Sequence, residues 1–353
     1  MAYISFEPSD FFNTKLYTGN ASTQVISSIG FDPAMTWIKE RDGTNNHELF
    51  DTVRGDDKHI EPNLTNAEAT ESGAFAFGTD QFTLGNWTPI NGSGNLTAAW
   101  NWKAGTTSGL TGGTITPTAY SFNTTSGLGI YAYTGTGANA TIPHGLGVAP
   151  HLVIVKHLSG ASDWEVGNSS FTSWVYHAGL NLTTGELSSA TCWNSTAPTS
   201  TVFSVGTNGA INGSGQTYIA YVFANVKGYS KFGSYIANNN TDGPFIYTGF
   251  SPAFVMIYDT TGGSYKSWCM FDTTRQPNNA NMGKTLYANR NYAEGKRGEG
   301  SASSTIPAID IVSNGFKPRV GNDEVNTVSD KYIYMAFAEF PFVSSNSIPT
   351  TAR

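Results

Sequence analysis

Short apolar runs separated by polar turns recur along the whole chain. "KYIYMAFAE" (331–339) and "HLVIVKH" (151–157) each place apolar side chains on both faces of an extended strand. Two apolar faces predict a central strand that is covered on both sides. Clusters such as NG, GTG and SNG between the runs supply the turns that antiparallel strands need. The pattern predicts an all-β chain, with short helices expected only near 65–70 and 287–295.

The same predicted order of strands recurs three times along the sequence. Each copy opens on a Tyr-led strand, at Tyr17, Tyr133 and Tyr235, which lie about 100 residues apart. A proline and a second strand follow in each copy, as "DPAMTWIK", "APHLVIVK" and "SPAFVMIY", and each copy closes on another apolar strand. This spacing suits a complete small sandwich domain. We therefore predict three tandem antiparallel β-sandwich units, jelly-roll-like or lectin-like.

The predicted unit boundaries fall in two short linkers. A Gly- and Thr-rich segment (105–120) follows the first copy, and segment 226–235 leaves almost no spare length between the second and third. The last two units are therefore expected to pack against each other. The predicted units span residues 1–112, 113–228 and 229–353, and the last of them ends in an extended polar tail.

Composition narrows the classes of function. The chain has 353 residues, a net charge of −7, 13% charged residues and no stripe of Lys and Arg, which argues against a nucleic-acid partner. No apolar stretch approaches membrane-spanning length, and the N-terminus lacks the pattern of a secretory signal. We therefore expect synthesis in a reducing cytoplasm, with Cys192 and Cys269 as free, buried thiols.

A D-T-x-R motif is the most specific polar signal. It gives the pairs Asp51–Arg54 and Asp272–Arg275, at a spacing that lets a carboxylate accept from a guanidinium and from turn N–H groups. We interpret both as salt bridges that lock a turn. The second copy has "VGNSSF" at the corresponding place and lacks both charges. We predict that this copy has diverged in role and that its loop at Gly167 has a different shape.

Motifs for catalysis and metal binding are missing from the sequence. It contains no H-E-x-x-H, nucleophile elbow, phosphate-binding loop or dinucleotide fingerprint, and no Cys/His ligand pairing. No pair of carboxylates stands two residues apart on a strand, as a glycosidase would favour. The tripeptide RGD at Arg54–Asp56 is interpreted as a chance match inside the turn motif. We expect no catalytic residue, cofactor or metal, and no enzyme activity.

Tryptophans are the better lead for ligand binding, because sugar rings stack on such side chains. Most of the eight are expected to fill the sandwich cores. Trp87 in "GNWTP" and Trp193 in "TCWNS" have polar neighbours. They are the candidates for exposed ligand contacts.

Several of these stretches also carry a family likeness. "IGFDPAMTWIKERDG", "AAWNWKAGTT", "HGLGVAPHLVIVK" and "DGPFIYTGFSPAFVMI" resemble a repeated β-rich module of tailed bacteriophage virion proteins, especially from marine and cyanobacterial phages. Those proteins are usually described as tail-associated or tail-fibre-like, and the resemblance covers nearly the whole chain. It implies a structural, surface-displayed role and no catalytic residues.

The resemblance leads to one expectation and two alternatives. We expect a virion structural protein of the tail fibre or tail tip, made in the host cytoplasm, with a surface for a host receptor or glycan. Its expected partners are other virion proteins and further copies of itself. The first alternative is a capsid decoration or cement protein that stabilises the head. The second is a glycan-cleaving virion enzyme.

Overall fold

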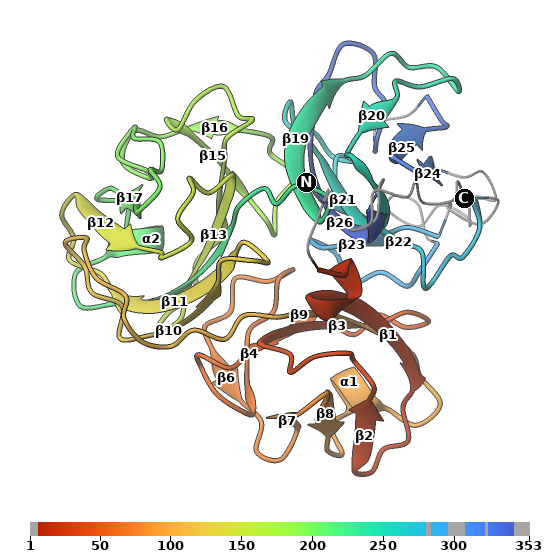
Figure 1. Ribbon diagram of the computed structural model, residues 1–353, viewed down its shortest axis with the longest axis horizontal. Helices are drawn as coiled ribbons and strands as arrows, with labels where there is room; N and C mark the ends of the chain where they lie inside the picture. Colours follow the sequence, from red (N-terminus) through yellow and green to blue (C-terminus); the bar gives the residue numbers. More distant parts are fainter. Residues whose placement is uncertain (1–5, 280–283, 296–307, 322–323, 342–353) are drawn as a thin grey trace.

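Strands make up nearly all regular structure in the computed structural model, which describes residues 6–279, 284–295, 308–321 and 324–341 (Figure 1). The all-β prediction is confirmed. The described helices are single turns: η1 (Pro8–Asp10), α1 (Thr88–Asn91) and α2 (Gly209–Asn212). None of the described helices is long and apolar enough to cross a lipid bilayer. The predicted polar tail lies outside the described residues.

The helices predicted near 65–70 and 287–295 are not present, so that prediction is wrong. In segment 65–70, Glu68 N–H donates to the carbonyl of Leu158 at 3.0 Å, and the segment ends in a short strand. In segment 287–295, Ala288 N–H donates to the carbonyl of Trp268 at 2.9 Å. Backbone groups of both segments bond to distant residues, and the local bond from Arg290 N–H to the Tyr287 carbonyl forms a single turn that does not continue as a helix.

The first third of the chain forms a larger sheet in the order β1-β9-β3-β4, a smaller sheet in the order β2-β8-β7 and the pair β5-β6. The bounds are β1 (Phe12–Thr18), β2 (Gln24–Ser27), β3 (Met35–Glu40), β4 (Glu48–Asp51), β5 (Lys58–His59), β6 (Ala69–Thr70), β7 (Phe75–Gly78), β8 (Gln81–Leu84) and β9 (Leu96–Trp102). We name these strands the first unit.

The second unit has a larger sheet in the order β10-β11-β18-β13-β14-β15-β16 and the pair β12-β17. Its strands are β10 (Ala119–Asn123), β11 (Leu128–Thr134), β12 (Ala140–Pro143), β13 (Leu152–His157), β14 (Glu165–Asn168), β15 (Tyr176–Gly179), β16 (Leu187–Ser188), β17 (Val202–Val205) and β18 (Thr217–Phe223).

The third unit has a larger sheet in the order β19-β26-β21-β22-β23 and a smaller one in the order β20-β25-β24. Its strands are β19 (Ser230–Ile236), β20 (Ile246–Tyr247), β21 (Phe250–Asp259), β22 (Cys269–Asp272), β23 (Leu286–Tyr287), β24 (Ile309–Val312), β25 (Gly315–Pro318) and β26 (Lys331–Pro341).

Strand register relates the three larger sheets position by position. In each larger sheet, one residue of β3, β13 or β21 pairs on one side with the last residue of β4, β14 or β22. On the other side it pairs with the closing strand β9, β18 or β26. These triplets are Met35 with Asp51 and Trp102, Leu152 with Asn168 and Phe223, and Phe254 with Asp272 and Phe337. The same pairing recurs at these positions in all three sheets, and the three repeats themselves stay a prediction. The exact unit boundaries stay a prediction.

The closing strands β9, β18 and β26 each lie between two neighbouring strands and are buried on both faces. In β26, Met335 and Phe337 belong to an apolar core to which all three units contribute. Tyr334 and Ala336 belong to a core of the third unit alone. The two-sided apolar pattern is therefore explained by a second layer that the other units supply.

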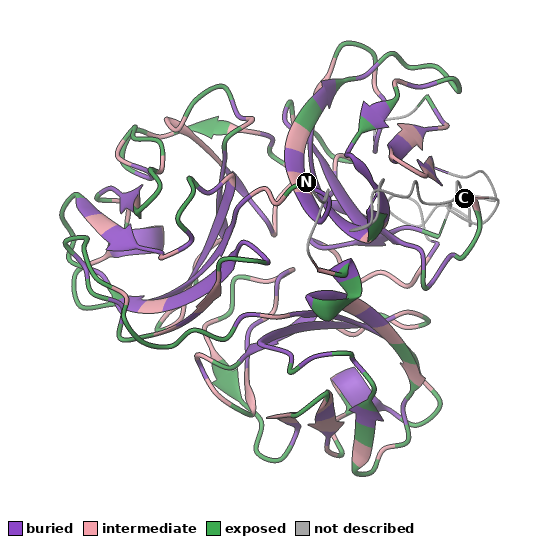
Figure 2. Cartoon of the chain, viewed as in Figure 1, coloured by how far each residue is buried: buried purple, intermediate pink, exposed green. Residues whose placement is uncertain are grey.

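The units pack around a common centre, with the larger sheets turned inward and most loops outward (Figures 1 and 2). Aromatic rings from different units meet there. The ring of Trp100 lies 6.0 Å from that of Phe254, and Phe223 lies 6.0 Å from Phe337. The second and third units pack against each other as predicted. The three units therefore pack against one another around a shared apolar core.

Candidate functional site

The pair Asp51–Arg54 locks the turn after β4, as predicted. The Asp51 carboxylate accepts from the backbone N–H groups of Val53 and Arg54, at 3.1 and 2.9 Å, and lies 2.5 Å from the Arg54 Nε. The guanidinium also donates to the Leu49 carbonyl at 2.8 Å. Burial, the largest single effect, would lower the pKa of Arg54, but Asp51, Tyr221 and Glu68 together outweigh it and the pKa is raised. The side chain therefore stays charged.

The pair Asp272–Arg275 repeats this arrangement after β22. Arg275 donates through Nε to Asp272 and through Nη2 to the Met270 carbonyl, and its side chain is fully buried. The guanidinium also lies 5.7 Å from the ring of Trp100, a residue of the first unit. Both predicted turn pairs are confirmed, and both lie in the interior of the molecule.

Both carboxylates also bind a neighbouring unit. Tyr221 of the second unit donates its hydroxyl to Asp51 at 2.7 Å. Trp100 of the first unit donates its indole N–H to Asp272 at 3.0 Å. The sequence predicted a local turn, whereas the structure uses the same carboxylates to join units.

The second unit has replaced this ionic junction. Register places Asn168, not Gly167, at the position of Asp51, and Phe171 stands at the position of Arg54. Asn168 still accepts from a backbone N–H two residues on, at 2.8 Å. The next N–H, of Phe171, donates to the Asn168 backbone carbonyl, whereas that of Arg54 donates to the Asp51 carboxylate, so the turns share one bond and differ in the next. Met335 of the third unit occupies the position that Trp100 and Tyr221 hold, and its side chain has no donor. Carboxylate, guanidinium and donor are thus all missing at this junction.

In a second set of contacts, a ring N–H of each unit again donates to the unit before it in the ring. The residue just before β4, β14 and β22 is His47, Trp164 and Trp268 respectively. Trp164 donates its ring N–H to the Glu61 carbonyl at 3.1 Å, and Trp268 to the Gly179 carbonyl at 2.9 Å. The second unit thereby binds the first, and the third binds the second.

His47 completes the cycle between the first unit and the third. Its Nδ1 accepts from the indole N–H of Trp37 at 2.9 Å, so its Nε2 carries the proton and donates to the Tyr287 carbonyl at 2.9 Å. Burial holds the pKa of His47 well below its usual range, which keeps the ring neutral. Three head-to-tail junctions close a ring within one chain.

The two predicted ligand-contact tryptophans differ in exposure. Trp193 is 0% exposed, so the expectation that its polar neighbours place it on the surface is wrong. Its ring instead joins the core of the second unit and lies edge-on to Trp174. Trp87 is half-buried, with its ring 4.6 Å from that of His59. Of the two, only Trp87 keeps part of its side chain exposed.

The first unit has a cleft lined by four short segments of the chain, the last of which ends two residues before Trp87. It has a volume of about 160 Å³, and its lining includes Asp56, Asp57, Phe75 and Gly85. Asp57 also accepts from the backbone N–H groups of Gly73 and Phe75, at 2.8 and 2.9 Å, which fixes the loop. The aromatic ring in this lining is Phe75, which is 1% exposed, so the lining offers a ligand mainly carboxylates for hydrogen bonding. Arg54 of the RGD tripeptide is 8% exposed and belongs to the interior ion pair.

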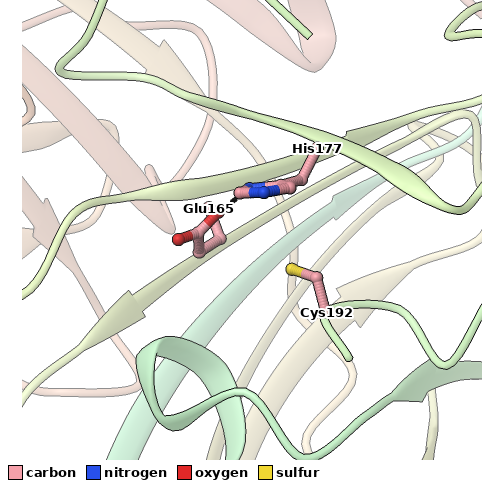
Figure 3. Close-up of side chains that lie close together, drawn as sticks. All are labelled: Glu165, His177 and Cys192. Atoms are coloured by element: carbon pink, nitrogen blue, oxygen red, sulfur yellow. Dashed lines mark hydrogen bonds and ion pairs between the residues drawn. The ribbon is translucent and has the colours of Figure 1, made fainter. Parts of the chain in front are cut away.

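Three potential metal ligands gather in the second unit: Glu165, His177 and Cys192 (Figure 3). One donor atom from each lies within 4.8 Å of the others. Cys192 and Cys269 are both free and buried, as predicted. The sequence analysis missed this group, because the three residues are widely and irregularly spaced. The available signal was a glutamate that precedes a histidine by 11 residues in Glu48–His59 and by 12 in Glu165–His177.

The family model described as "Domain of unknown function (DUF7483)" matches residues 7–341. No curated protein and no solved structure matches the chain.

Proposed function

We propose that this chain, which belongs to the family of unknown function over residues 7–341, is a structural protein of a tailed-phage virion. Its place is the tail fibre or tail tip, where it presents a surface to a host receptor or glycan. Its partners are other virion proteins and further copies of itself.

One observation carries the proposal: the polar residues that the repeats share serve to join the units. The carboxylates of Asp51 and Asp272 are 0% exposed and bind neighbouring units. Such an arrangement stabilises a rigid frame and leaves the loops free to vary, which is the usual division of labour in binding proteins. The resemblance to virion modules points to the same class of role.

The cleft of the first unit is our candidate for glycan contact, together with Trp87, which follows the lining residue Gly85 by two positions in the chain. Exposed side chains of an aromatic ring and carboxylates provide stacking and hydrogen bonding for a sugar. Trp87→Ala is expected to weaken binding of host envelope polysaccharide by about tenfold, the loss of one stacking contact. Tyr265→Ala is the control, since Tyr265 is 54% exposed but lies in the third unit.

A second candidate function is a capsid decoration protein. A closed ring of three similar units offers three similar outward edges, which fits a threefold position on a capsid lattice. Binding only to capsids stripped of the protein would favour this role. Release of product sugars from polysaccharide would instead favour the glycan-cleaving alternative.

Antibody labelling of intact particles in electron microscopy is the test. Label at the tail tip or fibres supports the proposal, and label spread over the head supports decoration. Particles without label, from a lysate that contains the protein, would contradict both.

A further inference from the structure

The second unit contains one group of side chains that the structural role does not use. Glu165 comes from β14, His177 from β15 and Cys192 from the loop after β16. Figure 3 shows the imidazole against the carboxylate, with the thiol turned toward them from the other side. Glu165 is 6% exposed and Cys192 is 0% exposed. The Nδ1 of His177 forms a short contact with the Glu165 carboxylate.

The first unit contains the same acid–histidine pair without the thiol. Glu48 and His59 stand at the positions of Glu165 and His177, and their Oε2 and Nδ1 atoms lie 2.6 Å apart. Ala74 stands at the position of Cys192, because its carbonyl accepts from Gly85 N–H as the Cys192 carbonyl accepts from Gly206 N–H.

The third unit has neither acid nor histidine at these positions. Register places Cys269 where Glu165 stands and Thr285 where His177 stands. The fold therefore tolerates alanine at the thiol position and unrelated residues at the other two. Among the described residues, only the second unit brings three such ligands together.

We propose that Glu165, His177 and Cys192 form a binding site for one divalent metal ion of the zinc class. Thiolate, imidazole and carboxylate are each zinc ligands, and the thiolate favours zinc or cobalt over magnesium or calcium. Three protein ligands leave a fourth position for water. This inference does not depend on the proposed virion role.

Loading the site requires two local changes. The hydrogen bond between His177 and Glu165 opens, so that both side chains turn their donor atoms toward the ion. The Cys192 thiol becomes a thiolate and releases its proton to solvent, as metal binding to cysteine requires. The metal neither gains nor loses electrons.

Cobalt provides the direct test on the full chain. Titration of reduced protein with Co²⁺ is expected to give thiolate-to-cobalt absorption that saturates at one ion per chain, and Zn²⁺ is expected to abolish it. Cys192→Ala copies the first unit and is expected to remove the absorption and lower Co²⁺ affinity by at least about 100-fold. Cys269→Ala, which removes the other buried thiol, is the matched control and is expected to keep the absorption.

A gain-of-site variant keeps the test informative. Ala74→Cys places a thiol beside Glu48 and His59, and is expected to raise the Co²⁺ stoichiometry from one to two per chain. Circular dichroism checks that each variant is folded, and Zn²⁺ is expected to raise Tm for the wild type but not for Cys192→Ala. Absence of thiolate-to-cobalt absorption in the folded wild type would overturn the proposal. Its persistence in Cys192→Ala would do the same.

Discussion

Buried charged side chains carry much of the specificity of this molecule at the scale of single residues. The carboxylates of Asp51 and Asp272 each neutralise an arginine, fix a turn and accept a hydrogen bond from another unit. A buried ion pair is costly to break, yet an apolar pair of similar volume often replaces it without loss. The second unit shows that the ion pair is dispensable, because it has the neutral residues Asn168 and Phe171 at the same positions.

Asp51→Asn is expected to lower the free energy of unfolding by about 3 kcal/mol, because it leaves the buried Arg54 guanidinium with only the more distant Glu68 carboxylate, 3.5 Å away, as counter-charge. Adding Arg54→Phe copies the second unit and is expected to recover most of that loss. Urea unfolding of the two single variants and the double variant measures the coupling. Glu71→Gln, at an exposed position, controls for the change in net charge. Additive losses in the double variant would contradict this explanation.

Glu48 makes stability depend on pH. Burial raises its pKa to about 7, although the hydrogen bond and charge of His59 lower it and Glu61 raises it further. An unfolded glutamate titrates near pH 4.3, so between about pH 4 and 7 the folded state binds more protons than the unfolded state. The contribution of Glu48 to stability is therefore lost as pH rises through this window.

Glu48→Gln removes this titration. Its free energy of unfolding relative to wild type is expected to rise by up to about 3 kcal/mol between pH 4.5 and 7.5. Urea unfolding at the two pH values measures the change, with Glu71→Gln as the control. A difference that is the same at both pH values would show that Glu48 titrates normally.

At the scale of elements, a buried asparagine anchors the turn before each closing strand. The three residues are Asn91, Asn212 and Asn326, and each is 0% exposed. The side-chain oxygen of each accepts from the backbone N–H two residues after the opening strand β1, β11 or β19. The donor–acceptor distances are 2.9, 2.8 and 3.0 Å. Each donates back to a carbonyl near the preceding strand, at 2.8, 2.7 and 2.9 Å. One side chain thereby fixes how the smaller sheet sits over the larger one.

The opening tyrosines complete this arrangement. Tyr17, Tyr133 and Tyr235 each donate their hydroxyl to the carbonyl of the residue before the asparagine, at 2.7 Å. The Tyr spacing that revealed the repeats in the sequence therefore reflects a repeated contact. It explains why tyrosine, and not another aromatic residue, opens each copy.

Asn212→Ala is expected to lower the free energy of unfolding by roughly 3 kcal/mol, because it leaves Thr136 N–H and the carbonyls of Ala138 and Gly206 without their partner. Hydrogen exchange is expected to accelerate first at β12 and β17, the pair that this asparagine holds. Asn208→Ala, in the cap of α2, is the matched control and is expected to cost about 1 kcal/mol. Equal losses for the two variants would contradict the anchoring role.

On the scale of the whole molecule, the units share one core and close a ring. Residues such as Trp37, Ile154 and Phe254 come from three different units and belong to the same apolar cluster. The junctions run head to tail, so each unit completes the interior of its neighbours. Unfolding of one unit would expose the inner faces of the other two.

The chain is therefore expected to unfold in a single calorimetric transition whose van't Hoff and calorimetric enthalpies agree. Phe254→Ala in the shared core and Phe316→Ala in the core of the third unit are each expected to cost about 3–5 kcal/mol. Both variants are expected to shift the whole transition. A separate early transition in Phe316→Ala would show that the third unit unfolds alone.

The sequence by itself determined the strands, their repeated order and the local turn pairs. Alternating side chains and turn residues act over a few positions, so "KYIYMAFAE" can be recognised as a two-faced central strand without its neighbours. For the same reason, the spacing in D-T-x-R was sufficient to predict the bonds of Asp51 with Arg54.

Only the tertiary structure decided which distant side chains these strands and turns bring into contact. Which side chain donates to Asp272 depends on how the first and third units pack, and Trp100 is 172 positions away. The polar neighbours of Trp193 did not reveal that its loop turns inward, and Glu165, His177 and Cys192 meet only when strands and loop are packed. Contacts between segments far apart in the chain follow from the burial of shared apolar faces, which local sequence patterns do not specify.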